Sequence, residues 1–176
     1  GAWLLESFCH INDRLGLKAE AHILSRDPGA FKKKMPHLAS QPALKFHAGD
    51  IQTFEFPKLG FTHLIHAATA TSVKLNADNP LEMSDTIVHG TRRALEFARQ
   101  VGVKKFLLTS SGAVYGRQPT DLTHVGEDYA GAPDTVSPLA AYGEGKRYAE
   151  MMCSFYAKSF GIEAKIARCF AFVGPH

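Results

Sequence analysis

Segments that read as short apolar strands alternate along this chain with longer segments that read as helices. The strands are expected at residues 19–25, 44–51, 62–68, 103–111 and 163–170, and the helices at residues 2–15, 28–35, 80–101 and 142–160. Strands that alternate with helices form right-handed βαβ units whose strands run parallel. Sheets of this kind are covered by helices on both faces. The alternation therefore predicts an α/β fold, with a doubly wound parallel sheet and helices on both faces.

Composition agrees with one globular domain and excludes several classes of protein. The chain has 176 residues, of which 45% are hydrophobic and 21% are charged. The net charge is +3 and the Lys and Arg residues are scattered, which argues against a nucleic-acid partner. No apolar run approaches the roughly 20 residues that a membrane span needs, so no membrane partner is expected. The cysteines at positions 9, 153 and 169 form no CxxC pair, which indicates reduced thiols and a cytoplasmic location.

The sequence does not predict a metal site. It has neither an HExxH motif nor a cluster of carboxylates. His63 and His66 are three residues apart on a predicted strand, so their side chains point to opposite faces. His66 is expected to pack at the end of its strand and not to act as a catalyst.

Tyr142 and Lys146 lie four residues apart where a helix is predicted to begin. Positions four apart share one face of a helix, so a phenol and an ammonium become neighbours. A free tyrosine has a pKa of about 10, and a nearby cation lowers it by favouring the phenolate. Ser111 stands at the end of a predicted strand, where ligands bind in parallel sheets. Together these three residues predict proton transfer at a substrate hydroxyl group, although Tyr-x-x-x-Lys alone is a weak signal.

Six short motifs occur together in this chain and carry a family resemblance. They are "GDI" at 49–51, "HAA" at 66–68, "HGTRRALEFA" at 89–98, "TSSGAVYG" at 109–116, "YGEGK" at 142–146 and "RCFAFVGP" at 168–175. In this combination the chain resembles the extended short-chain dehydrogenase/reductase family, the NAD(P)-dependent nucleotide-sugar epimerases and dehydratases. The resemblance covers nearly the whole chain and implies a Rossmann-type fold.

The resemblance also implies how the chain is divided. Gly1, followed by a helix, matches the third glycine of the family's GxxGxxG phosphate loop. The first strand of the sheet is therefore expected to be missing from this chain. Residues 1–176 are expected to form part of the dinucleotide-binding domain, and the substrate domain is expected to be absent.

The resemblance assigns roles to individual residues. Ser111 would bind the substrate oxygen, Tyr142 would transfer the proton, and Lys146 would stabilise the phenolate and bind the cofactor ribose. The residues expected to bind the cofactor are Gly1, Ser25, Arg26, Asp50, Ile51, His66, Ala67, Ala68, Ser110, Tyr142 and Lys146.

The end of the predicted strand at 19–25, which corresponds to the family's second strand, favours NADP over NAD. NAD-preferring members of the family carry an Asp where this chain has Ser25, and Arg26 follows. An arginine attracts the 2′-phosphate of NADP, whereas a carboxylate repels it. The alternatives are that Arg26 stacks on adenine while NAD binds, or that Asp27 turns inward.

The residues after Ser111 bear on the type of reaction. The family's 4,6-dehydratases carry an acid pair there, but this chain has Gly112 and Ala113, which cannot exchange protons. We therefore expect a nucleotide-sugar epimerase or 4-keto-reductase, with a 4,6-dehydratase or decarboxylase as the alternative. Two departures from the family pattern are Ile87 and Ala171, where an Asn is common. The change at Ala171 leaves open a reductase of a non-nucleotide alcohol, and a non-catalytic dinucleotide-binding module is a further alternative.

The two long helices are expected to form a homodimer. The helix at 142–160 is apolar on several sides, and Phe155, Tyr156 and Phe160 are predicted to lie in the core. Family members pair this helix and the helix at 80–101 across a dimer as a four-helix bundle, and the resemblance implies the same arrangement here.

Overall fold

The computed structural model describes residues 1–69 and 73–171, so the motif at 168–175 is described only as far as Ala171. The chain divides into two compact units, Gly1–Glu55 and residues 56–171. The first unit contains α1 (Ala2–Leu15), β1 (Ala21–Ser25), α2 (Pro28–Lys34), α3 (Pro36–Ala39) and β2 (Leu44–Ala48). The second contains β3 (His63–His66), α4 (Val73–Asp78), α5 (Pro80–Gln100), β4 (Lys105–Ser111), the 3-10 helices η1 (Gly112–Tyr115) and η2 (Pro138–Ala140), α6 (Ala141–Phe160) and β5 (Glu163–Cys169).

In the first unit, α1 packs on a two-stranded parallel sheet. Strands β1 and β2 pair from Ala21 opposite Leu44 to Ser25 opposite Ala48. Cys9 of α1 is buried with Leu38 and Leu44 in a small core. The helix ends as predicted, because Gly16 takes the left-handed conformation with φ of 59°.

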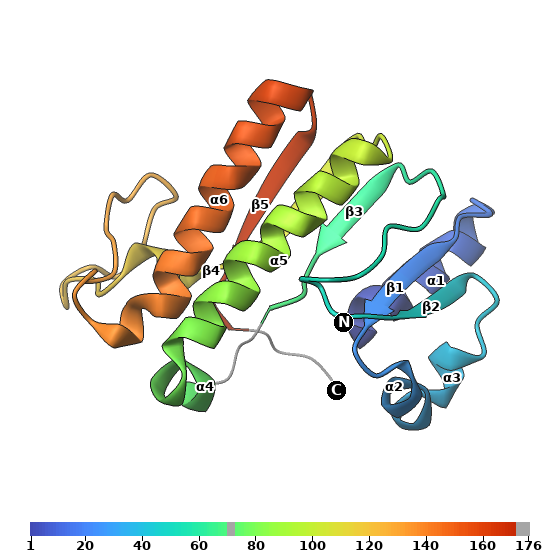
Figure 1. Ribbon diagram of the computed structural model, residues 1–176, viewed down its shortest axis with the longest axis horizontal. Coiled ribbons are helices and arrows are strands. Elements are labelled where there is room, and N and C mark those ends of the chain that lie inside the picture. The colour runs from blue at the N-terminus through green and yellow to red at the C-terminus, as the bar shows by residue number, and fades with distance from the viewer. Residues whose placement is uncertain (70–72, 172–176) are drawn as a thin grey trace. The chain divides into compact units, whose positions relative to one another are not determined.

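In the second unit, α5 and α6 lie side by side against one sheet, with the strand order β3–β4–β5 (Figure 1). All of its neighbouring strands run parallel. Along β4, Phe106, Leu108 and Ser110 are buried, and the residues between them are more exposed. This alternation is the period of two that a strand imposes on its side chains. The core of this unit therefore lies between the sheet and the two long helices.

The parallel pairing is confirmed, but the strands form two sheets, β1–β2 and β3–β4–β5. In the dinucleotide-binding fold the strand order runs third, second, first, fourth, fifth, sixth. Within each sheet of this chain, as in both halves of that order, strands that are consecutive along the chain lie side by side.

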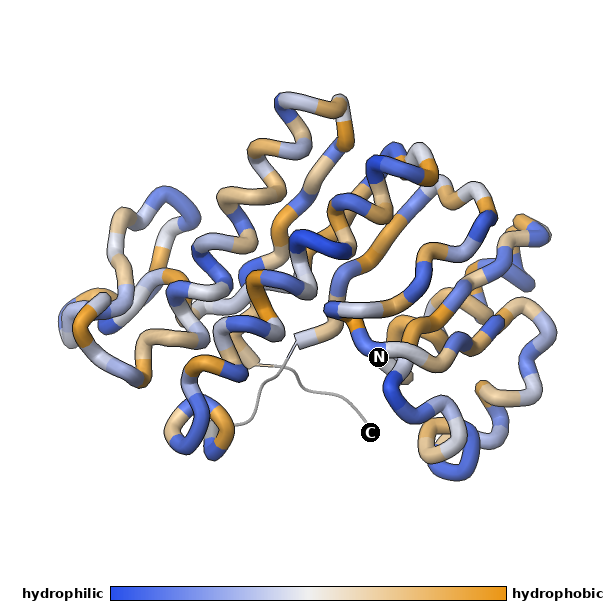
Figure 2. The backbone as a smooth tube through the Cα atoms, viewed as in Figure 1, coloured by the Kyte–Doolittle hydropathy of each residue, from blue (hydrophilic) through white to orange (hydrophobic). Residues whose placement is uncertain are grey.

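Each helix and strand predicted from the sequence is present, with ends shifted by a few residues. The cap of α5 is also confirmed, because the Asn79 side chain accepts a hydrogen bond from the Glu82 N–H and Pro80 is the first helical residue. The prediction that Phe155 and Phe160 lie in the core was wrong, since 58% and 52% of these residues are exposed. Figure 2, coloured by hydropathy, shows why the signal is ambiguous: hydrophobic and hydrophilic residues recur together along α6. An apolar stripe wider than the buried face of a helix leaves some aromatic side chains in solvent.

Candidate active site

Tyr142 and Lys146 lie in the first turns of α6, and a contact from α4 fixes where this helix begins. Asn76 donates a hydrogen bond to the Leu139 carbonyl at 2.9 Å and accepts one from the Tyr142 N–H at 3.1 Å. One amide side chain thus spans the junction between η2 and α6. The Lys146 ammonium nitrogen lies 5.9 Å from the centroid of the Tyr142 ring. The predicted neighbour relation of phenol and ammonium is therefore present in the structure.

The two glycines between Tyr142 and Lys146 allow α6 to approach its neighbours closely. A Cβ atom at Gly143 would lie 3.0 Å from the Ala113 carbonyl oxygen of η1 and 2.7 Å from Pro133 Cγ. A Cβ at Gly145 would lie 3.4 Å from three side-chain atoms of Ile87 in α5. Ile87, which stands where the family often has Asn, is almost fully buried. Because the two glycines of "YGEGK" carry no side chains, the start of α6 can lie close to η1 and to α5.

The end of β4 meets α6 through consecutive residues. The Thr109 carbonyl accepts a hydrogen bond from Lys146 Nζ at 2.8 Å. The buried Ser110 hydroxyl donates to a Glu150 carboxylate oxygen at 2.5 Å. The Ser111 hydroxyl accepts from the Ala113 N–H at 3.1 Å and caps η1. Ser111 is thus held at the strand end, next to residues that are bonded to α6.

Burial lowers the pKa of Lys146. Only 3% of this residue is exposed, and loss of water lowers the pKa of its amine to about 8, against the opposing fields of Cys169 and Glu150. With a pKa of about 8 the amine is still mostly protonated at neutral pH. An ammonium group has three N–H donors, and within the described residues Lys146 uses one of them, on Thr109.

These donors fit the predicted cofactor. Within residues 1–69 and 73–171 the Tyr142 hydroxyl makes no hydrogen bond, and Lys146 retains donors that the protein does not use. A ribose carries hydroxyl groups that accept such hydrogen bonds. The donor set at the start of α6 is therefore compatible with a dinucleotide ribose.

His66 is the last residue of β3 and is buried, as the sequence predicts. It shares a hydrogen bond with Thr91 through Nε2 and Oγ1, which are 3.1 Å apart. Burial, with a smaller contribution from Lys146, lowers the pKa of His66 to about 4, so the ring is neutral at pH 7. Ala67 and Ala68 follow and are exposed.

The remaining residues of the cofactor prediction belong to the first unit, and the structure describes them there. Gly1 precedes α1 and is exposed, and the exposed Arg26 follows Ser25 at the end of β1. Asp50 and Ile51 follow β2, and a carboxylate oxygen of Asp50 accepts a hydrogen bond from the Gln52 N–H. Each of these residues lies at a helix start, at a strand end or just after one, where the family resemblance expects the cofactor contacts.

Sequence reasoning missed three residues that shape this region. Glu150 and Arg168 form an ion pair of 2.8 Å between α6 and β5, and Asn76 bridges to α6. Glu150 had a usable signal, since it continues the spacing of four that relates Tyr142 to Lys146. Asn76 had none, because its partners are more than 60 residues away in the sequence.

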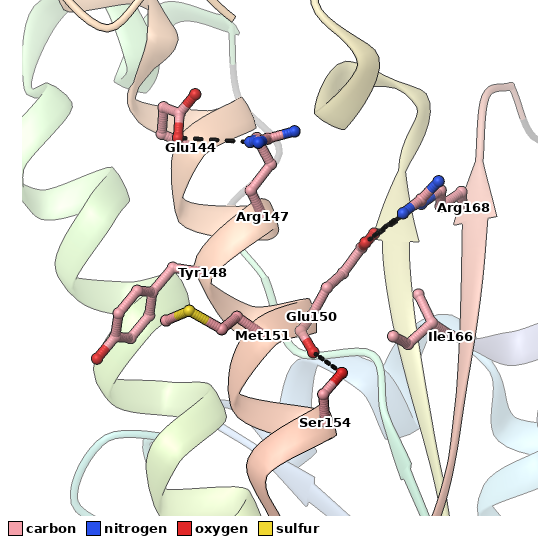
Figure 3. A pocket seen from close by; sticks show the side chains of 8 residues that line it. All are labelled: Glu144, Arg147, Tyr148, Glu150, Met151, Ser154, Ile166 and Arg168. Carbon is pink, nitrogen blue, oxygen red and sulfur yellow. Dashed lines mark hydrogen bonds and ion pairs between the residues drawn. The ribbon is translucent and has the colours of Figure 1, made fainter. Parts of the chain in front are cut away.

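A hollow of about 550 Å³ lies between α6 and β5 (Figure 3). Its lining residues are Glu144, Arg147, Tyr148, Glu150, Met151, Ser154, Ile166 and Arg168. None of the predicted catalytic residues is among them. The hollow therefore adjoins the Glu150–Arg168 pair and is distinct from the Ser111, Tyr142 and Lys146 group.

Among the described residues, no group of three or more His, Cys, Asp or Glu side chains could hold a metal ion. No helix in that part of the chain has the length and apolar character needed to cross a membrane.

Comparison with known proteins relates this geometry to a family. Residues 9–176 match the NAD dependent epimerase/dehydratase family. The chain is 33% identical over 167 residues to UDP-glucuronic acid decarboxylase 1 of Arabidopsis thaliana, which covers 94% of this chain and 37% of the relative. It is 27% identical over 148 residues to UDP-glucuronate 4-epimerase of Thermodesulfobacterium geofontis, which covers 81% of this chain and 43% of the relative.

Solved structures show the same fold. The UDP-Glc/GlcNAc 4-epimerase of Campylobacter jejuni aligns with a TM-score of 0.73 at 26% identity, over 85% of this chain and 45% of that one. The UDP-glucuronic acid 4-epimerase of Bacillus cereus in complex with NAD aligns with a TM-score of 0.76 at 23% identity, over 95% and 53%. This chain thus spans about half the length of these structures and less than half of the curated relatives. The Rossmann-type fold is confirmed, and the chain belongs to the NAD-dependent epimerase/dehydratase family.

Proposed function

We propose that this protein is an NAD(P)-dependent epimerase or 4-keto-reductase that acts on a nucleotide sugar. The observation that carries the proposal is the group formed at the end of β4 and the start of α6. There a buried ammonium lies beside the Tyr142 ring, and Ser111 stands at the adjoining strand end. Relatives named as nucleotide-sugar 4-epimerases and decarboxylases support the same class of substrate.

Each of the three residues has one role in this proposal. Ser111 donates a hydrogen bond to the substrate oxygen, and Tyr142 takes the proton from the substrate hydroxyl. Lys146 stabilises the phenolate by its charge and uses its remaining donors on the cofactor ribose. When bound, the nicotinamide cofactor supplies hydride transfer at the same carbon.

The packing around Gly112 supports epimerase or reductase chemistry over dehydration. A Cβ atom at this position would lie 2.6 Å from the ring of Phe170, so the ring occupies the space of a side chain. An acid at position 112, which 4,6-dehydratases of the family carry, would have to displace that ring. Decarboxylation of a nucleotide-sugar acid is the second candidate, because curated relatives are named as UDP-glucuronic acid decarboxylases.

The preference for NADP remains part of the proposal and rests on Ser25 and the exposed Arg26. Neighbouring structures of a 4-epimerase from Bacillus cereus and of another from Thermus thermophilus contain NAD, and they give no support to this preference. Assays with NAD and with NADP in turn would measure the preference directly.

We extend the proposal to the organisation of the protein. Residues 1–176 contribute to a dinucleotide-binding domain, and the protein acts in the cytoplasm as a homodimer through α5 and α6. The support for the dimer is an exposed apolar stripe on α6, formed by Tyr148, Met151 and Phe155, together with Leu81 on α5.

The experiment that tests the function is Tyr142→Phe in the protein at its full natural length. Turnover of UDP-glucuronic acid and UDP-glucose is measured with NAD and with NADP. Loss of the proton-transfer group should lower kcat by about 100-fold to 10,000-fold. Tyr129→Phe makes the same chemical change elsewhere in the second unit and should keep full activity. Unchanged turnover in Tyr142→Phe would reject the catalytic assignment.

A further inference from the structure

Glu150 continues the line of residues that begins with Tyr142 and Lys146. The three are spaced by four on α6, so they lie along one face of the helix, with about 5–6 Å between successive Cβ atoms. Only 8% of Glu150 is exposed. A carboxylate is rarely buried to this extent unless hydrogen bonds and an opposite charge satisfy it.

The partners of Glu150 come from two neighbouring strands. The Ser110 hydroxyl of β4 donates to Oε1 at 2.5 Å. Arg168 of β5 donates from Nη2 to Oε2 at 2.8 Å, and from Nε to both oxygens at 3.1 and 3.2 Å (Figure 3). The hydrogen bonds to Glu150 and to Tyr115 raise the pKa of Arg168, so its guanidinium group stays charged. Glu150 therefore joins the end of β4 and β5 to α6, one turn beyond Lys146.

Several groups face Lys146 from the elements packed around it. Tyr142 and Glu150 lie on its own helix, Cys169 lies on β5, and His66 lies on β3. Arg168, also on β5, is paired with Glu150. Burial of the lysine favours the neutral amine, whereas the fields of Cys169 and Glu150 act the other way and raise its pKa. His66 is neutral at pH 7 and supplies no charge. The carboxylate of Glu150 thus opposes the effect of burial on Lys146.

We propose that Glu150 is a positioning residue for the group of Ser111, Tyr142 and Lys146. It holds the end of β4 against α6 through Ser110, and it keeps the buried Lys146 amine in its charged form. Only a charged Lys146 stabilises the Tyr142 phenolate, so Glu150 acts on the reaction through Lys146. This inference rests on the proposed function, which assigns the proton transfer to Tyr142.

The direct test is the titration of Lys146 in the intact protein, followed by NMR with labelled lysine and assigned with Lys146→Arg. In Glu150→Gln the pKa of Lys146 should fall by about one unit, which is the effect expected when a nearby unit charge is removed from a partly buried site. Glu150→Asp keeps the charge and should restore most of the shift. Glu144→Gln removes a partly exposed carboxylate from the same helix and should leave the Lys146 titration unchanged. An unchanged Lys146 pKa in Glu150→Gln would overturn the inference.

A second variant covers the case in which Glu150→Gln does not fold. That substitution removes the charged partner of the half-buried Arg168, which is costly. Glu150→Gln combined with Arg168→Gln removes both charges and leaves neither unpaired. The Lys146 pKa should again fall in this double variant, and a value equal to that of the unchanged protein would count against our proposal.

Activity provides a separate readout. The rate should fall as pH rises through the Lys146 pKa, because the cation is lost, so the alkaline limb of the kcat profile should move to lower pH in Glu150→Gln. A limb that stays in place while the NMR pKa falls would show that Lys146 charge does not control the reaction, which overturns the inference alone. Full turnover in Tyr142→Phe would instead overturn the proposed function, and with it the catalytic meaning of Glu150.

Discussion

At His66 and Lys146, loss of water lowers the pKa of each side chain, with different consequences. His66 falls to about 4 and is neutral at pH 7, while Lys146 falls to about 8 and stays mostly charged. The histidine can serve as a fixed hydrogen-bonding group to Thr91, and the lysine can serve as a cation. Both bases are buried, but only the lysine is charged at pH 7, because its ordinary pKa is much higher than that of the histidine.

The buried His66 should make stability depend on pH. Its pKa is about 4 in the folded protein and about 6.5 when unfolded, so the unfolded chain binds more protons between these values. The free energy of unfolding should therefore fall as pH falls from 6.5 toward 4, by up to about 1.4 kcal/mol per pH unit. Hydrogen exchange of β4 amides at several pH values measures this in the second unit.

The matched comparison uses two histidines of the same strand. His66→Gln should remove the extra pH dependence, whereas His63→Gln, at an exposed position, should keep it. Equal pH dependence in the original protein and in His66→Gln would contradict this prediction.

Among the elements, α6 depends on contacts from outside itself for its starting point. Its first residue has no side-chain cap of its own, and Asn76 supplies hydrogen bonds from α4 to both sides of the junction. Asn76→Ala should remove the bond to the Tyr142 N–H. A hydrogen bond of this kind contributes about 0.5–1.5 kcal/mol, so exchange of that amide should become roughly 2 to 12 times faster.

Asn79→Ala is the control for that experiment, since Asn79 lies three residues away but caps α5. It should speed exchange of the Glu82 amide and leave the Tyr142 amide unchanged. If both variants affected Tyr142 equally, a general loosening of the region would explain the result better than the contact of Asn76.

The elements that sequence predicts well are those with local signals. Three helix ends could be predicted, because caps and turns depend on neighbouring residues. They are marked by Gly16, by Asn79 with Pro80, and by Gly161. Neither α4 nor η2 was predicted, since short segments carry too little periodicity to distinguish them from loops.

The candidate site shows the same division. Tyr142 and Lys146 were found from their spacing, which belongs to one helix. The partners of Glu150, on β4 and β5, required the sheet to be formed first. Phe155 was predicted to lie in the core because it is apolar. Apolar character alone does not show whether another element covers the side chain, and Phe155 is exposed.

For the whole molecule, the exposed stripe on α6 predicts self-association. Tyr148, Met151 and Phe155 are 45%, 43% and 58% exposed and lie on neighbouring turns. Phe155→Glu should weaken dimerisation by at least about tenfold, because a charge would be buried in an apolar interface. Analytical ultracentrifugation over a range of concentrations measures this change. Phe155→Leu keeps the apolar surface and should still dimerise, and a monomer at every concentration in the unaltered protein would refute the prediction.

The division into two compact units has a practical consequence for spectroscopy. The single tryptophan, Trp3, belongs to the first unit, whereas the long helices that dominate the circular dichroism belong to the second. Tryptophan fluorescence therefore reports on the first unit, and circular dichroism reports mainly on the second. Denaturation curves from the two methods that fail to coincide would report separate melting of these parts, with one unit unfolded while the other is still folded.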